Sequence, residues 1–241
     1  MSVEYRLPRV AIELYEVAGN KKALEIARGM GGWVQTRLNA VPAETRTRMW
    51  GRYIAGEYGG MNEVMARLSR MTGERRFLEC ARLFDNINFF FGDTNHTHGL
   101  ARNVDMLRGK HANQHIPQIT GALETYRNTG ELPYYRVADN FWDIVTGGYM
   151  YAIGGVAGAR TPNNAECFTA EPDSLWENGF ASGGQNETCC TYNLLKLDRQ
   201  LFMYDQTAKY MDHYELGLYN HILASVAESD AGNTYHVPLN P

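Results

Sequence analysis

The architecture of this chain can be read from Ala122-Leu-Glu-Thr-Tyr-Arg-Asn-Thr-Gly130-Glu, which is followed closely by Tyr134-Tyr-Arg-Val-Ala138. Apolar residues recur at helical spacing in both segments. Gly130 stands between them, where a helix ends most easily in the left-handed conformation that glycine adopts at little cost. The stretch therefore predicts two helices joined by a tight turn at a glycine.

The same pattern occurs at two earlier places, which makes it a repeat. The first copies are Ala11-Ile-Glu-Leu-Tyr-Glu-Val-Ala-Gly19-Asn before Ala23–Ala27, and Met65-Ala-Arg-Leu-Ser-Arg-Met-Thr-Gly73-Glu before Phe77–Ala81. The glycines are 54 and 57 residues apart, from Gly19 to Gly73 and from Gly73 to Gly130. Each copy therefore holds a helix pair and a long loop.

A looser fourth copy runs from Leu194 to Leu223, with its turn at Asp205-Gln206. Helix pairs that repeat at this spacing predict an all-α fold, either a solenoid or a closed α/α toroid. Short strands are expected only near Tyr151–Ile153 and Thr234–Val237.

Bulk composition narrows the class of protein. With 241 residues, 44% hydrophobic and 21% charged, the chain is typical of a soluble globular protein. The net charge of -4 and the lack of a basic run argue against nucleic acid and anionic membranes as partners. No apolar run is long enough to span a bilayer, and the N-terminus does not have the pattern of a signal peptide. Four cysteines do not make a disulfide framework, and the adjacent Cys189 and Cys190 should not bridge each other, so we expect a reducing compartment such as the cytoplasm.

The run Gln185-Asn-Glu-Thr-Cys-Cys-Thr-Tyr-Asn193 has the most unusual chemistry. A carboxylate, Glu187, precedes an adjacent cysteine pair at the entrance to a helix whose apolar period is clear from Leu194 onward. Glu187 and Cys189 share a side only if the segment before the helix is extended. Their oxygen and sulfur atoms would then suit a zinc ion. The alternative is a buried thiol pair beside a surface glutamate.

Two further loops are polar and precede the helices that end at the repeat turns. They are Glu57-Tyr-Gly-Gly-Met-Asn-Glu63 and Lys110-His-Ala-Asn-Gln-His-Ile-Pro117. In a toroid such loops meet on one face, so we expect them to line one cleft together with Glu187–Cys189. Each also has a simpler explanation: Asn62 caps a helix, and His111 and Asn113 satisfy loop backbone groups.

The region between Tyr149 and Glu187 departs from the repeat and reads as a long loop. Such an insertion is usually functional or disordered, and its aromatic residues Phe168, Trp176 and Phe180 favour an ordered loop. It contains four carboxylates, any of which could serve as a general acid in sugar hydrolysis. Spacing alone does not choose among them: Glu166, Glu171, Asp173 and Glu177.

Taken together, these motifs resemble glycoside hydrolase families 127 and 146, the bacterial β-L-arabinofuranosidases. The matching runs, in the order of the family, are Glu57–Glu63, His111-Ala-Asn-Gln-His-Ile-Pro117, Glu187-Thr-Cys-Cys-Thr-Tyr-Asn-Leu-Leu-Lys-Leu197 and Leu218-Tyr-Asn-His-Ile-Leu-Ala-Ser225. The resemblance implies an (α/α)6 barrel followed by β-rich domains. It also implies release of β-linked L-arabinofuranose, with retention of configuration, from an arabinose-containing oligosaccharide or glycoside.

The resemblance also implies roles for individual residues. In the family a cysteine thiolate is the nucleophile, held on Zn2+ with a glutamate and two other cysteines, and by position Glu187 and Cys189 are the first two zinc ligands. Ala165-Glu-Cys-Phe168 best matches the context of the general acid/base, which makes Glu166 that residue. Cys190 is expected to be a core thiol. The implied substrate contacts are Asn62, His111 and Tyr235.

Two departures from the family pattern affect these expectations. A histidine that many relatives carry is absent from Thr146-Gly-Gly-Tyr-Met-Tyr151, which leaves the exact sugar open. The sequence stops at Val237-Pro-Leu-Asn-Pro241, before the Cys-Cys-x-Gly motif that supplies the nucleophile, and it begins within the barrel. We therefore expect residues 1–241 to be a partial barrel, incomplete at both ends, without the downstream β-rich domains and inactive in isolation.

Two other functions remain open at this stage. One is a non-catalytic α/α toroid that binds a plant-type oligosaccharide. The other is a sugar epimerase on the same scaffold, with His111 or His115 as its acid/base. The sequence leaves the oligomeric state open.

Overall fold

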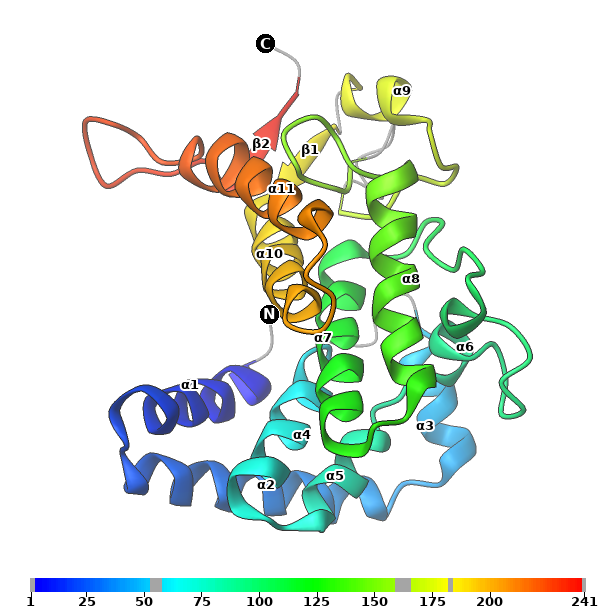
Figure 1. The fold of residues 1–241 in the computed structure, drawn as a ribbon, viewed down its shortest axis with the longest axis vertical. Coiled ribbons are helices and arrows are strands. Elements are labelled where there is room, and N and C mark those ends of the chain that lie inside the picture. The colour runs from blue at the N-terminus through cyan, green and yellow to red at the C-terminus, as the bar shows by residue number, and fades with distance from the viewer. Residues whose placement is uncertain (1–2, 53–57, 159–165, 182–183, 240–241) are drawn as a thin grey trace. The chain divides into compact units, whose positions relative to one another are not determined.

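The computed structural model describes residues 3–52, 58–158, 166–181 and 184–239, and it is predominantly helical (Figure 1). The chain divides into two compact units. The first consists of Met1–Arg102 and Pro117–Val137, and the second of Asn103–Ile116 and Ala138–Pro241. Among the described helices, none combines the length and the apolar character needed to cross a lipid bilayer.

The first unit is built from helices that follow one another as hairpins. In chain order they are α1 (Val3–Ala18), α2 (Lys21–Asn39), α3 (Ala43–Trp50), α4 (Met61–Thr72), α5 (Arg75–Arg82), α6 (Ile87–Phe90) and a 3-10 turn, η1 (Leu100–Arg102). Two longer helices, α7 (Ala112–Thr129) and α8 (Leu132–Gly148), contribute residues to both units.

The predicted repeat turns are confirmed. Gly19, Gly73 and Gly130 all lie in the left-handed region, with φ of 64°, 72° and 72°. In each turn the glycine N–H donates to a carbonyl four residues earlier, as the Gly73 N–H does to Ser69 O at 2.8 Å. A residue with a Cβ is strained in this conformation, which is why all three copies place a glycine there.

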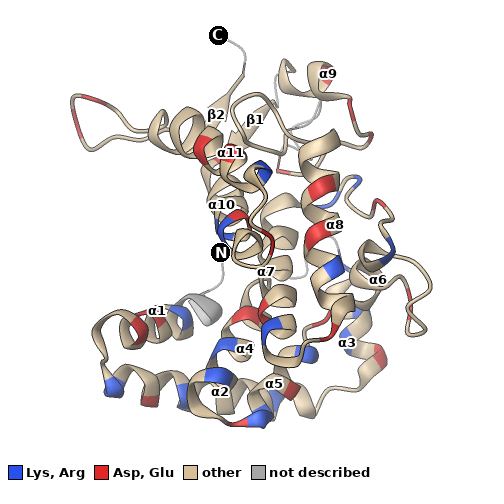
Figure 2. Cartoon of the chain, in the orientation of Figure 1, with Lys and Arg blue, Asp and Glu red and all other residues tan. Residues whose placement is uncertain are grey.

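In the first unit, the α1–α2 hairpin packs against the α4–α5 hairpin. Helix α1 contacts α2 and α4, while α5 contacts α4 and α2. Ile12, Met65, Leu68 and Phe77 are fully buried in the shared core. Lysine, arginine, aspartate and glutamate residues lie along these helices (Figure 2), where Arg67 forms ion pairs with Glu16 and Glu63.

The second unit contains the fourth hairpin, which confirms the looser repeat. Helices α10 (Thr188–Phe202) and α11 (Ala208–Gly217) pack against each other and are joined through the predicted turn at Asp205-Gln206. A π-helical turn, η3 (Leu218–Leu223), follows α11, and a short helix, α9 (Leu175–Gly179), lies in the long loop. The described part of that loop is ordered by Phe168, which is buried and packs edge-on against Phe141 and Tyr149.

Helix α10 is held in the second unit by a buried carboxylate. Asp198 is fully buried and accepts hydrogen bonds from the Trp142 indole of α8 at 2.5 Å and from Nδ1 of His213 in α11 at 2.8 Å. The other ring nitrogen of His213 lies 3.2 Å from the carbonyl oxygen of Gly154. One side chain therefore fixes three segments relative to the helix that begins at the cysteine pair.

Two short strands form an antiparallel pair. Strand β1 (Gln185–Glu187) pairs with β2 (His236–Pro238), which places Glu187 opposite His236. The strand expected near Thr234–Val237 is thus present, displaced toward the C-terminus. The strand expected at Tyr151–Ile153 is wrong: the Gly154 N–H donates to Tyr151 O, and with φ of 81° at Gly154 the chain turns there.

Candidate metal centre and active site

The centre of the site is the junction between β1 and α10. Glu187 ends the strand and is the N-cap residue of the helix, with an extended backbone (φ -80°, ψ 130°). Helix α10 begins at Thr188. The helical spacing of apolar residues becomes visible in the sequence only from Leu194 onward. Acidic N-cap residues usually accept a hydrogen bond from the first turn, yet the Glu187 side chain makes no such bond. Its carboxylate is directed elsewhere.

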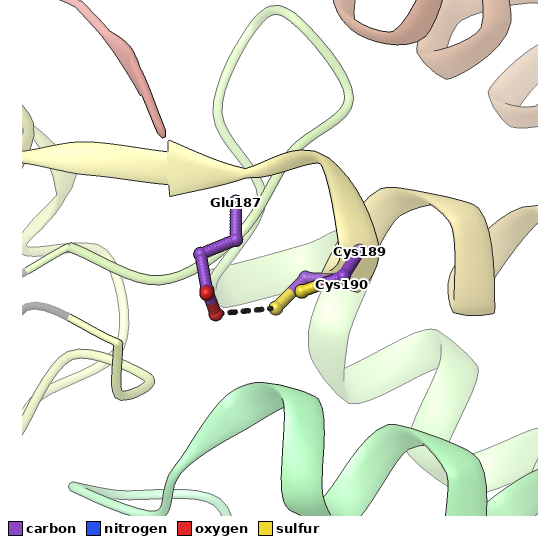
Figure 3. Close-up of side chains that lie close together, drawn as sticks. All are labelled: Glu187, Cys189 and Cys190. Atoms are coloured by element: carbon purple, nitrogen blue, oxygen red, sulfur yellow. Dashed lines mark hydrogen bonds between the residues drawn. The ribbon is translucent and has the colours of Figure 1, made fainter. Parts of the chain in front are cut away.

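That carboxylate faces the two thiols (Figure 3). The Sγ atom of Cys190 donates to Oε2 of Glu187 at 3.6 Å. One oxygen of Glu187 and the sulfurs of Cys189 and Cys190 all lie within 4.8 Å of one another. Glu187 and Cys190 are buried, and neither cysteine forms a disulfide. The alternative of a surface glutamate beside the thiols is therefore wrong.

The crowding of these groups affects their protonation. A hydrogen bond with Cys189, followed by burial and the nearby charges of Cys189 and Glu187, raises the pKa of the Cys190 thiol well above its ordinary value. A thiolate at Cys190 would therefore meet the nearby charge of Glu187 in a buried place, which is unfavourable. A bound cation would remove this conflict, since a coordinating thiol is deprotonated outright.

The donor set fits zinc. Two sulfurs and a carboxylate oxygen are ligand types that Zn2+ takes, with bonds of about 2.0–2.3 Å. The three atoms are close enough to share one ion after small adjustments. Cys190, expected to be only a core thiol, is buried as predicted but also belongs to this group. Its position three residues after Glu187, one helical turn away, is the signal that points to it.

A second pair of side chains lies in the same unit. The Nε2 atom of His111 lies 2.8 Å from Oε2 of Glu166. Their backbones are held together by an isolated antiparallel bridge between His111 and Cys167, in which the Ala112 N–H donates to Glu166 O at 2.9 Å. The His111 side chain is 9% exposed and the Glu166 side chain 47%. His111 thus pairs with a carboxylate side chain and not with loop backbone, and Glu166 is open to solvent.

The other carboxylates of the long loop have different surroundings. Glu171 forms an ion pair with Arg108 at 2.7 Å. Glu177 is exposed on α9 beside Trp176, which is 72% exposed. Within the described residues, Glu166 is the one loop carboxylate grouped with Glu187, which supports its selection among the four candidates.

His236 is a site residue that the sequence analysis missed. A ring nitrogen of His236 and carboxylate oxygens of Glu166 and Glu187 lie within 4.8 Å of one another. The pairing of β1 with β2 brings His236 opposite Glu187 across almost fifty residues of chain. Nothing in the local sequence reveals that register, because two short polar strands carry too little hydrophobic pattern to define it.

Tyr235 also lies at this junction. The Thr188 N–H, the first of α10, donates to Tyr235 O at 3.1 Å. Burial, followed by a hydrogen bond to Cys189 and the nearby charge of Glu187, raises the pKa of the Tyr235 phenol above its ordinary value. The side chain is 45% exposed, so its ring remains accessible beside the thiols.

Asn62 lies in the first unit. The N-cap residue of α4 is Gly60, so the alternative that Asn62 is the cap is wrong. Asn62 is buried, and its Nδ2 donates to Gln118 O at 2.8 Å. Its place near the other site residues stays a prediction, and the motif residues Glu57 and Ala165 lie outside the described residues.

The polar residue Asn113 connects the His111 segment to α10. Its Oδ1 accepts a hydrogen bond from Asn193 at 3.1 Å, and the same Asn193 amide donates to the Cys189 carbonyl at 3.1 Å. Asn113 therefore helps to hold the histidine segment next to the helix that carries the cysteines.

Comparisons with known proteins identify the family of the chain. Residues 6–241 match the family described as beta-L-arabinofuranosidase, GH127 catalytic domain. No curated protein sequence matches the chain.

Among solved structures, the chain is similar to a GH127 beta-arabinofuranosidase (TM-score 0.73, 20% identity, 98% of this chain and 35% of that chain). It is also similar to a glycoside hydrolase (TM-score 0.73, 17% identity, covering 98% of this chain and 40% of that chain). A third is a GH127 beta-L-arabinofuranosidase from Geobacillus stearothermophilus T6 (TM-score 0.69, 19% identity, 98% and 38%). At these identities the likeness shows the fold and confirms the predicted fold class, and the chain spans 35–40% of the length of these proteins.

Proposed function

We propose, because this chain belongs to the GH127 catalytic-domain family, that it takes part in the retaining hydrolysis of β-linked L-arabinofuranose. The substrate is an arabinose-containing oligosaccharide or glycoside. The observation behind the proposal is the position of Glu166. Its solvent-exposed carboxyl has an oxygen within 4.8 Å of a carboxylate oxygen of Glu187. The Glu187 carboxylate also faces the thiols of Cys189 and Cys190, which form no disulfide. A glycosidase that uses a cysteine thiolate requires a side chain that transfers protons and a metal site with sulfur ligands.

Glu166 is the proposed general acid/base. His111 and the backbone bridge to Cys167 fix its position, while its exposure leaves the carboxyl free to meet a substrate. In the first step it gives its proton to the leaving glycosidic oxygen. In the second step its carboxylate takes a proton from the water that releases the sugar.

Glu187 and Cys189 are the proposed zinc ligands. When bound, Zn2+ would supply the charge that keeps a cysteine sulfur in its reactive thiolate form. A cysteine held in this way would bond to the anomeric carbon as the glycosidic bond breaks, and water would then replace the sulfur on that carbon and return the thiol. Residues 1–241 contain no Cys-Cys-x-Gly run, the motif that the family resemblance implies for this nucleophile.

Asn62, His111 and Tyr235 are the proposed sugar contacts. The imidazole of His111 contacts the carboxyl of Glu166. A sugar hydroxyl that binds next to Glu166 would therefore also lie close to the His111 ring. Tyr235 offers an exposed aromatic face next to Cys189, which suits the apolar side of a furanose ring. Asn62 is included on the family resemblance alone.

The test is Glu166→Gln in the full-length enzyme that contains this chain, assayed on p-nitrophenyl β-L-arabinofuranoside and on an arabinobioside. We expect kcat to fall by about 10²–10⁴-fold on the disaccharide. The loss should be smaller for the formation of the intermediate from the nitrophenyl substrate, because nitrophenolate leaves without a proton. Glu177→Gln is the matched control, since Glu177 is an exposed carboxylate of the same loop. Equal activity of Glu166→Gln and wild type would disprove the assignment.

The same variants separate the alternatives. A non-catalytic binding toroid predicts sugar binding without turnover in both wild type and Glu166→Gln. For an epimerase, His115 is a poor acid/base, because burial lowers its pKa to about 4 and its Nδ1 is engaged with His111 O at 2.8 Å.

A further inference from the structure

Two aromatic side chains of α9 are exposed and lie against each other. Trp176 is 72% exposed, which makes it the most exposed of the described aromatic residues, and Phe180 is 47% exposed. Their ring centroids are 4.4 Å apart at an interplanar angle of 38°. Large apolar side chains that stay exposed together commonly mark a ligand-binding surface. We call Trp176 and Phe180 the aromatic platform.

The loop that carries the aromatic platform begins and ends at the candidate active site. Glu166 lies before α9 in the chain and Glu187 after it, and a carboxylate oxygen of one is within 4.8 Å of a carboxylate oxygen of the other. Loops whose ends lie close together are frequently functional. The platform is therefore part of a segment that returns to the two carboxylates.

The end of α9 lies next to the start of β1. A Cβ atom at Gly184, the residue before β1, would lie 2.6 Å from the carbonyl oxygen of Asn178. A Cβ atom at Gly179 would lie 2.6 Å from Cε1 of Tyr151 and 2.9 Å from Cδ1 of Leu239, directly after β2. From Gly184 to Glu187 is three residues of extended chain, or about 10 Å. This separation suits a substrate that extends beyond the sugar at the carboxylates.

Helix α9 is fixed at both ends, so the platform is held in place. The Asp173 N–H donates to Gly148 O at 2.9 Å, which ties the start of α9 to the end of α8. Asn178 is buried, and its Nδ2 donates to Ser174 O at 2.7 Å. An apolar surface that is already ordered binds a ligand without the cost of ordering its own side chains.

The size of the platform favours a small ligand over a protein. Two aromatic side chains offer at most about 500 Å², whereas each partner in a stable protein complex buries roughly 800 Å². A sugar ring matches the platform in area, and its C–H groups can pack on an aromatic face whose π-electrons carry partial negative charge.

We propose that Trp176 and Phe180 bind the sugar residues on the leaving-group side of the scissile bond. The released arabinofuranose is a terminal sugar, so the rest of the oligosaccharide must extend away from Glu166 and Glu187. This inference rests on the proposed function for the class of ligand. It adds that the chain selects oligosaccharides over glycosides that have no second sugar.

The test is ligand binding to the full-length enzyme that contains this chain, with Glu166→Gln present to prevent turnover. Isothermal titration calorimetry gives Kd for an L-arabinofuranosyl trisaccharide and for methyl β-L-arabinofuranoside, which lacks a second sugar. Trp176→Ala should raise the Kd of the trisaccharide roughly tenfold, since shielding about 50 Å² of apolar surface from water corresponds to that factor. The Kd of the methyl glycoside should change much less. Trp176→Phe keeps an aromatic ring and should retain most of the affinity.

The controls separate the platform from the proposed function. Phe180→Ala should weaken trisaccharide binding as Trp176→Ala does, while Trp33→Ala, at an exposed tryptophan of α2 in the first unit, should not. Trisaccharide binding that is unchanged in both Trp176→Ala and Phe180→Ala, or an equal loss of affinity for the two ligands, overturns the platform alone. An enzyme that binds neither ligand contradicts the arabinofuranose substrate itself, and the platform with it.

Discussion

The Nε2 atom of His111 lies 2.8 Å from Oε2 of Glu166, so a mostly buried imidazole holds a carboxyl that is open to solvent. The bridge between His111 and Cys167 fixes both backbones, which leaves the side chains little freedom to separate. A group that transfers protons must be held within hydrogen-bond reach of its target. His111 therefore positions Glu166.

The first prediction concerns this pair. We expect His111→Ala in the full-length enzyme to lower kcat by roughly 10–100-fold, since a misplacement of about 1 Å at a reacting group can cost that much. His111→Gln keeps an N–H donor and should recover part of the loss. Steady-state kinetics of both variants provide the measurement. Unchanged kcat and KM in His111→Ala would show that the pair has no role in turnover.

The second prediction concerns Gly121, which faces Asn62. A Cβ atom built at Gly121 would lie 2.0 Å from Cγ of Asn62, whose amide is tied to Gln118 O. Gly121→Ala should therefore lower the free energy of unfolding by about 1–3 kcal/mol, the usual cost of overpacking. Gly29→Ala is the matched control: it has nothing within 4 Å and should raise stability by about 0.5–1 kcal/mol. Urea unfolding of both variants measures the difference, and equal stabilities would contradict the close approach.

The third prediction concerns Asp198, the buried acceptor shared by Trp142 and His213. Asp198→Ala leaves an indole N–H and an imidazole unpaired in the core, so we expect a loss of about 3–5 kcal/mol in unfolding free energy. Asp198→Asn keeps one acceptor oxygen and should lose less. Thermal unfolding followed by circular dichroism distinguishes the two. If Asp198→Ala left the free energy of unfolding unchanged, the helices around α10 would be held mainly by apolar packing.

The fourth prediction concerns pH. Burial raises the pKa of Asp85 to about 7, although Tyr134 donates to its Oδ2 at 2.5 Å. Because the folded-state pKa exceeds the unfolded value of about 3.9, the folded state is favoured most at low pH, and this contribution is lost as pH rises through about 7. Each pKa unit corresponds to about 1.4 kcal/mol.

The test is the unfolding free energy of wild type and Asp85→Asn at several values between pH 4 and 8. The unfolding free energy of Asp85→Asn minus that of wild type should increase with pH up to about 7 and then level off. Glu228→Gln, at an exposed loop carboxylate, is the control substitution. A constant difference between Asp85→Asn and wild type across the range would show that Asp85 does not change its charge there.

The sequence predicted the hairpins well because their turns depend on local geometry. Gly19, Gly73 and Gly130 mark positive φ angles, which only a few residue types tolerate, so their spacing revealed the repeat. An extended segment was expected only on the condition that Glu187 and Cys189 act together; Glu187 is extended, whereas Cys189 already lies in α10. In contrast, Tyr151–Ile153 forms a turn because the glycine that follows favours it over the expected strand.

The site was only partly predictable. Glu187 and Cys189 stand out by their spacing, and Glu166 needed the resemblance to separate it from the other loop carboxylates. His236 could not be found, since its partner Glu187 is distant in sequence and only the strand register brings them together. Cys190 was expected to be a core thiol; it is buried, and it also lies close to Glu187 and Cys189.

The pairing of β1 with β2 also sets an order of assembly. During synthesis the cysteine pair leaves the ribosome well before residues 236–238, so β1 has no strand partner until the segment after η3 has been made. At about 5–20 residues per second, this delay lasts for several seconds. The thiols of Cys189 and Cys190 spend that interval without the β1–β2 pair that adjoins the first turn of α10.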